Sequence, residues 1–141
     1  MSRTRRVGLA SGILVIAWVG RFTRADGTLN GAAAVAAGPG PDTTIDEVTT
    51  FTGTAFSVAS QPPGNAVYEP VLVFPPGTLG ISNGSEVDLS GMLEAVAIRF
   101  GAGRIFVSGE AGGLTAQDSF GMQETPQNER YLRNVLWWLT Q

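Results

Sequence analysis

The arrangement of apolar and polar positions predicts a hairpin in the last third of the chain. Residues 94–100 (EAVAIRF) and 104–108 (RIFVS) are two mainly apolar runs, and Gly101-Ala102-Gly103 joins them. Two such runs separated by three residues that include glycine are typical of a β-hairpin. In the second run Ile105 and Val107 share one face, because side chains alternate along a strand.

Two upstream stretches also predict strands. Residues 45–58 are rich in Val, Thr and Phe, which are common in strands, and residues 70–74 (PVLVF) form a short apolar run. Residues 80–90 are polar, so we expect a loop there with a turn at Asn83-Gly84. The segment 26–44 contains the low-complexity run GAAAVAAGPGP, which we interpret as a linker.

The chain ends in a predicted amphipathic helix. Leu132, Val135, Leu136 and Leu139 repeat at the spacing i, i+3, i+4, i+7, which gives one apolar stripe that we expect to pack on the sheet. Tyr131 and Trp138 flank this stripe. Asn128 precedes it, and its residue type favours a helix N-cap.

The first 25 residues have two interpretations. A basic start is followed by an apolar run at 7–20 and by the small residues Thr23 and Ala25, so residues 1–25 resemble a secretory signal peptide or an N-terminal membrane anchor. The protein would then be exported or membrane-anchored. Alternatively, residues 12–17 form a buried strand of a parallel sheet in a cytoplasmic protein, since periodicity does not separate short apolar runs.

The amino-acid composition limits which catalytic and metal-binding mechanisms are possible. The chain has no Cys, His or Lys, and all nine basic residues are Arg. Thiolate nucleophiles, Cys-ligated metals and Ser-His-Asp catalysis are therefore excluded. From Asp26 onward four Arg stand against twelve acidic residues, and such an acidic surface argues against a nucleic-acid partner. Nothing in the sequence predicts a metal or another cofactor.

A resemblance enters through the C-terminal motifs. The chain resembles the C-terminal half of a glutamine-amidotransferase-like family of the class I, trehalose-utilisation type, and the resemblance covers residues 45–141. The residues that carry it are Phe100-Gly101, Gly103-Arg104, Gly109-Glu110-Ala111, Thr115-Ala116-Gln117, Gly121-Met122, Asn128, Asn134, Trp138 and Leu139. A Thr- and Gly-containing stretch at 48–56 is a weaker match.

The resemblance implies an α/β fold, here an incomplete flavodoxin-like three-layer domain that is β-rich, with the C-terminal helix packed on the sheet. Ligands of open α/β sheets bind beyond the carboxyl ends of the strands, where residues 109–117 would lie. True class I amidotransferases share a Cys nucleophile with a His–Glu pair. This chain has neither Cys nor His, which leaves its activity in doubt.

Four residues are candidates for weak ligand binding: Glu110, Thr115, Gln117 and Asn134. Glu110 follows an apolar strand, and its carboxylate is suited to bind a ligand or to act as a base; alternatively it accepts hydrogen bonds from nearby backbone N–H groups or pairs with Arg104 or Arg130. Thr115 and Gln117 are suited to a polar pocket or to their own loop. Asn is a poor residue for the middle of a helix, so we expect Asn134 to bind the Glu110 loop. No residue is assigned a catalytic role.

Three functions remain open. The first is a non-catalytic amidotransferase-like binding or scaffold domain for a small molecule or protein. The second is a hydrolase that uses Glu110 with a water or a cation. The third is a truncated domain without independent function. A sheet edge left exposed by a missing half favours pairing with another chain, which makes a homodimer an expected partner arrangement.

Overall fold

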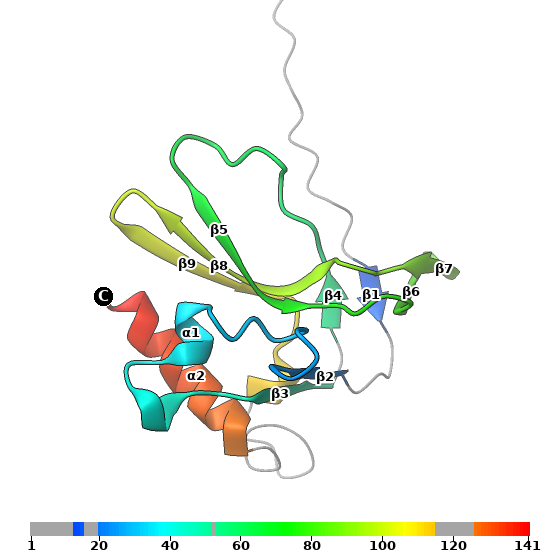
Figure 1. The fold of residues 1–141 in the computed structure, drawn as a ribbon. Helices are drawn as coiled ribbons and strands as arrows, with labels where there is room; N and C mark the ends of the chain where they lie inside the picture. Colours follow the sequence, from blue (N-terminus) through cyan, green and yellow to red (C-terminus); the bar gives the residue numbers. More distant parts are fainter. Residues whose placement is uncertain (1–12, 16–19, 52, 115–125) are drawn as a thin grey trace, which may run out of the picture.

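The structure is a computed structural model, and it describes residues 13–15, 20–51, 53–114 and 126–141. The described part is a mixed α/β fold that is rich in strands and carries a helix at its C-terminus (Figure 1). This much of the predicted fold class is confirmed. Every strand pair among the described residues is antiparallel, whereas a flavodoxin-like sheet is built from parallel strands.

The largest sheet has three strands in the order β5 (Val67–Val73), β8 (Leu93–Phe100) and β9 (Gly103–Ser108). The predicted hairpin is confirmed: β8 pairs with β9 and places Ile98 opposite Ile105. Its turn is one residue shorter than expected, since Gly103 already belongs to β9. Gly101 adopts a φ of 59°, which glycine reaches without steric cost.

Three smaller strand pairs surround this sheet. They are β1 (Ile13–Val15) with β4 (Gly53–Ala55), β2 (Gly20–Thr23) with β3 (Glu47–Thr50), and β6 (Leu79–Ser82) with β7 (Ser85–Asp88). The loop expected at 80–90 was therefore wrong, although the turn at Asn83-Gly84 is present. Both turn residues have positive φ, 50° and 78°, which matches the twist of a tight hairpin and allows the segments on either side of the turn to pair as strands.

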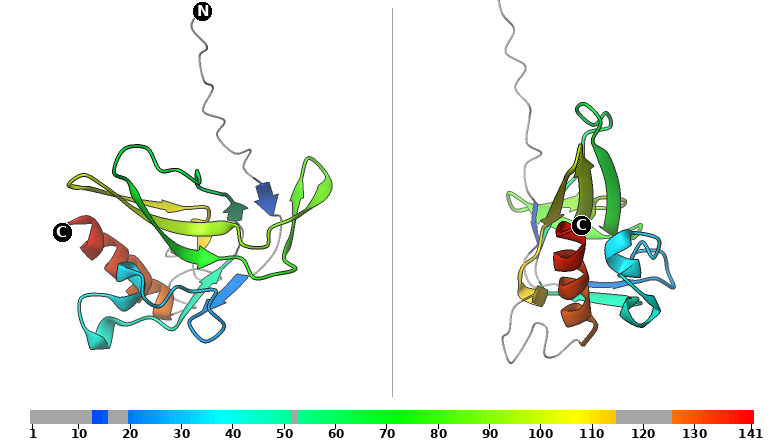
Figure 2. Two further views of the ribbon diagram at one scale, coloured as in Figure 1. Left: turned by 45° about the horizontal axis from the view of Figure 1, so that its top comes forward. Right: turned by 90° about the vertical axis from the view of Figure 1, so that its left-hand side faces the viewer.

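The helical elements are α1 (Ala34–Ala37), η1 (Pro41–Thr43), η2 (Gly112–Leu114) and α2 (Pro126–Leu139). Helix α2 lies below β9 and beside α1 in both views of Figure 2. Its buried residues are Asn128, Tyr131, Asn134, Val135 and Trp138, while Leu136 is 55% exposed and Leu139 is 39% exposed. The predicted leucine stripe is thus wrong as the packing face, because two aromatic residues and an asparagine at the same helical spacing contact the core instead.

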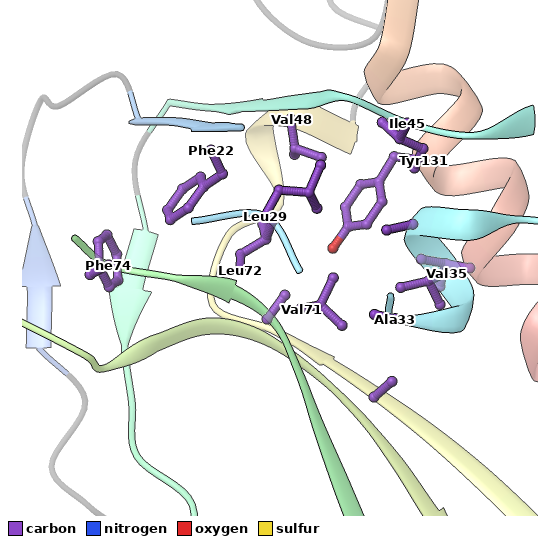
Figure 3. Packing of buried hydrophobic residues seen from close by; sticks show 14 of the residues in the cluster. Phe22, Leu29, Ala33, Val35, Ile45, Val48, Val71, Leu72, Phe74 and Tyr131 are labelled. Carbon is purple, nitrogen blue, oxygen red and sulfur yellow. The ribbon is translucent and has the colours of Figure 1, made fainter. Parts of the chain in front are cut away.

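The core lies between α2, α1 and the sheet. Figure 3 shows the Tyr131 ring among Leu29, Val35 and Val71, with its hydroxyl directed toward the sheet. The segment 26–44, which we interpret as a linker from its composition, contributes buried side chains to this core: Leu29, Ala33, Val35 and Ala36. Small alanines allow this segment to pack closely against α2, so it belongs to the folded part of the chain.

The N-terminal region also contributes to the fold. Strand β2 places Phe22 in the core, where its ring meets Phe74 edge to face at 5.5 Å. The Arg24 guanidinium donates hydrogen bonds to the carbonyls of Ile45 (2.9 Å) and Gly31 (2.9 Å). Cleavage before Asp26 would remove both residues. Residues 1–12 and 16–19 lie outside the described residues, and among those described no helix has the length and apolarity needed to cross a membrane.

Phe22 tests whether the N-terminal segment is part of the stable fold. We expect Phe22→Ala to lower the free energy of unfolding by about 3–5 kcal/mol, as is usual for a buried phenylalanine. Phe100→Ala is the matched control, because Phe22 is 1% exposed and Phe100 is 51% exposed. Urea unfolding of the full chain measures both. Equal effects of the two substitutions would show that Phe22 does not lie in the core.

Candidate functional site

Glu110 lies between β9 and η2, and its side chain is buried. Its carboxylate accepts the backbone N–H of Gly113 at 2.9 Å (Oε2) and 3.2 Å (Oε1). The alternative, an ion pair with Arg104 or Arg130, is not observed. Arg104 donates to the Gln141 carbonyl and lies 5.8 Å from the Trp138 ring, and Arg130 donates to the Thr44 carbonyl. Of the contacts considered for Glu110, the structure therefore shows the hydrogen bond from a backbone N–H.

Asn128 joins the Glu110 segment to the helix and to β3. It is the third residue of α2, not the N-cap predicted from its residue type. Its amide oxygen accepts the Thr49 N–H at 3.0 Å, and its amide nitrogen donates to the Thr49 carbonyl (2.6 Å) and the Gly113 carbonyl (3.0 Å). The Asn128 side chain is buried, and all of these partners are backbone groups.

Asn134 is also buried, but its partners differ from the expected ones. Its amide nitrogen donates to the carbonyls of Val35 (3.0 Å) and Thr43 (2.9 Å), so it joins α2 to α1 and η1. For the described residues, the prediction that Asn134 binds the Glu110 loop is wrong, because Asn128, six residues earlier, makes the bond to Gly113. Thr115 and Gln117, the other two candidates, lie outside the described residues.

The structure adds one residue that the sequence analysis did not select. Glu94 is the second residue of β8 and is 1% exposed. The pKa of its carboxyl is raised to about 7: burial is the largest cause, a hydrogen bond with the Thr50 side chain opposes the shift, and the charge of Glu110 adds to it. Its Oε1 atom has no hydrogen-bond partner among the described residues. The available signal was an acidic residue inside an otherwise apolar strand.

Glu94 and Glu110 approach each other around Gly53 in β4. A β-carbon on Gly53 would lie 2.9 Å from Glu94 Oε1, 3.2 Å from Glu110 Cβ and 3.3 Å from Glu110 Cγ. Gly113 is similarly enclosed, since a β-carbon there would lie 2.7 Å from the Thr49 carbonyl oxygen. Glycine at both positions allows the two acidic side chains to share one buried site.

The buried acids have no cationic partner in the part of the chain that the structure describes. The ion pairs found there are Arg21–Glu47, Arg24–Asp46 and Arg133–Glu129, and none involves Glu94 or Glu110. No group of three or more acidic residues suited to a metal ion occurs among these residues. The hydroxyl of Tyr131 is buried without a partner, and burial, followed by the charge of Glu94, raises its pKa.

A second surface lies on the sheet face that points away from α2. Cross-strand pairing places Tyr68, Ile98 and Ile105 side by side on this outer face, with Val107 next to them. With Pro63, Ala66 and Phe100, the first three line a hollow of about 300 Å³. Phe100 and Ile105 are each 51% exposed, which is unusual for large apolar side chains that lie together.

Comparison with known protein families, with curated proteins and with solved structures finds no match for this chain. The amidotransferase-like resemblance therefore remains a prediction from the motifs.

Asn128 offers a test of how the site is held. We expect Asn128→Ala to lower the free energy of unfolding by about 1–3 kcal/mol, because it leaves the partly buried backbone groups of Thr49 and the buried carbonyl of Gly113 without this partner. The control is Arg133→Ala on the same helix, which removes only an exposed pair with Glu129. Thermal and urea unfolding compare the variants. A loss for Asn128→Ala no larger than that for Arg133→Ala would contradict the assignment.

Proposed function

We propose that the protein is a non-catalytic binding or scaffold domain. The observation that carries this proposal is the role of the buried polar side chains: Glu110, Asn128 and Asn134 are buried and bind backbone groups of their own fold. Side chains used in this way hold elements together and are not available to a substrate. The second hypothesis, a hydrolase using Glu110, would require this carboxylate to leave the Gly113 N–H.

The binding surface in this proposal is the outer face of the sheet formed by β5, β8 and β9. Tyr68, Ile98, Phe100, Ile105 and Val107 give it an apolar centre. Exposed apolar side chains that lie together on a sheet are stabilised when a second apolar layer covers them. A sheet face about 10 Å from a second sheet face is the usual arrangement of such layers.

We propose that the partner on the outer face of the sheet is a second copy of the chain. In the register of the sheet, Val67, Arg99 and Arg104 occupy the opposite face, so the apolar centre contains no charged side chain. Two copies related by a twofold axis would bring these centres together without opposing like charges, even though each chain carries a net charge of −3. An isologous dimer is the simplest assembly with these properties.

The self-association is testable with analytical ultracentrifugation over a range of protein concentrations. We expect a concentration-dependent dimer for the wild-type chain and a monomer for the double variant Phe100→Ser, Ile105→Ser. Leu136→Ser is the matched control: Leu136 is an apolar residue on α2 that is 55% exposed and lies away from this face. A wild-type monomer at every concentration, or a monomeric Leu136→Ser variant, would contradict a dimer through the outer face.

The third hypothesis, a truncated domain without independent function, makes a different prediction. A chain with the described core is expected to unfold in one cooperative step, because buried side chains from β2, α1, β5, β8 and α2 pack together. Near-UV circular dichroism during a thermal melt measures this step. A gradual loss of signal would favour the fragment hypothesis and contradict independent folding.

Two further proposals rest on the sequence. The amidotransferase-like resemblance and its flavodoxin-like three-layer arrangement would require parallel strands beyond those described. An exported or membrane-anchored location rests on the basic start and apolar run of residues 1–25. The burial of Phe22 supports retention of that part of the segment in the folded protein, which is more consistent with an uncleaved anchor, or with the cytoplasmic alternative, than with cleavage before Asp26.

A further inference from the structure

Two acidic side chains share a buried site without a balancing charge. Glu94 comes from β8 and Glu110 from the segment that connects β9 to η2, and both lie against Gly53 of β4. Both are buried, with 1% and 7% of their surfaces exposed. An ionised carboxylate in such surroundings loses its hydration, so it requires hydrogen bonds, a cation or a proton.

The groups around the pair indicate whether a hydrogen bond, a cation or a proton compensates the charge of each acid. Glu110 accepts the Gly113 N–H, whereas Glu94 Oε1 is unpartnered and faces Gly53 and the Glu110 side chain. The described neighbours are Thr50 of β3, Gly53 of β4, Glu110 and Tyr131 of α2. Only Glu110 and Tyr131 of these titrate, and neither supplies positive charge. A proton on Glu94 is therefore the remaining way to reduce the charge.

We propose that Glu94 and Glu110 form a proton-binding pair that makes the packing of β8, the Gly109–Leu114 segment and α2 sensitive to pH. The proton stays on Glu94 and allows its carboxyl group to lie buried in the same site as the Glu110 side chain. Loss of that proton places two negative charges in one buried site. The contacts next to the pair are the hydrogen bond from the Gly109 N–H to the Glu94 carbonyl (2.8 Å) and the Asn128 bond to Gly113.

The direction of the pH effect follows from the two states of Glu94. Its pKa is about 7 in the folded chain and 4.5 in the reference state, so the folded chain holds the proton more tightly than the unfolded chain. The resulting stabilisation is fully present below the unfolded value and is lost as pH rises through the folded value. The pKa values of Asp26, Glu47 and Asp88 are lowered by hydrogen bonds, so their effects fall in a more acidic range.

Urea unfolding of the full chain, followed by tryptophan fluorescence, tests the proposal. We expect the unfolding equilibrium constant to rise about 100-fold from about pH 5 to about pH 8. Glu94→Gln should remove most of this rise, because an amide does not ionise. Glu110→Gln should retain a smaller rise at lower pH, since burial of Glu94 persists while the neighbouring charge is gone. Glu129→Gln, at an exposed acid on α2, should behave as wild type.

Three results would overturn the proposal. One is a wild-type stability that does not change across this pH range, and another is an unchanged pH dependence in Glu94→Gln. The third is a recovery of wild-type stability at the alkaline end on adding Ca²⁺ or Mg²⁺ that Glu94→Gln does not show, because the pair would then be a cation site. Hydrogen exchange at residues 109–114, corrected for the intrinsic pH dependence, is expected to accelerate in the wild type and not in Glu94→Gln.

Discussion

The amide side chains of Asn128 and Asn134 determine how the terminal helix sits on the rest of the molecule. Asn128 bonds both backbone groups of Thr49 in β3 and the carbonyl of Gly113, and Asn134 bonds carbonyls in α1 and η1. These bonds fix the rotation of α2 about its axis. Tyr131, between the two asparagines, then enters the core, and the apolar packing follows from this orientation.

This constraint explains why the helix could be predicted from the sequence while its buried face could not. Leu132, Val135, Leu136 and Leu139 have the spacing of a packing face, but Tyr131, Asn134, Val135 and Trp138 have the same spacing one residue earlier. Hydrophobicity favours the leucines. The burial of two aromatic rings and the hydrogen bonds of Asn134 outweigh that preference, and neither the partners of Asn134 nor their positions are visible in local sequence.

The strands show a similar division. The β8–β9 hairpin could be predicted because both its runs are apolar and its turn contains glycines, all within sixteen consecutive residues. The β6–β7 hairpin was missed because its strands have four residues each and are largely exposed, so only its Asn-Gly turn carried a signal. The segment 26–44 looks like a linker by composition, but alanine is also the residue that fits where α1 approaches α2 closely. The site was found only in part: Glu110 follows a recognisable strand, whereas its neighbour Glu94 is defined by contacts with β3 and β4.

The composition of the chain gives a physical reason for a proton at this neighbour. With no Lys or His, the only side chain that can bring positive charge to a buried acid is the long, strongly charged guanidinium of Arg. The space between Gly53, Gly113 and Thr50 is too close-packed for a group of that size, as the contacts of the absent β-carbons show. A proton adds no volume and removes the charge where it is placed. The same glycines that bring β4 and η2 against the two acids thus make protonation of Glu94 the compensation that the fold can accommodate.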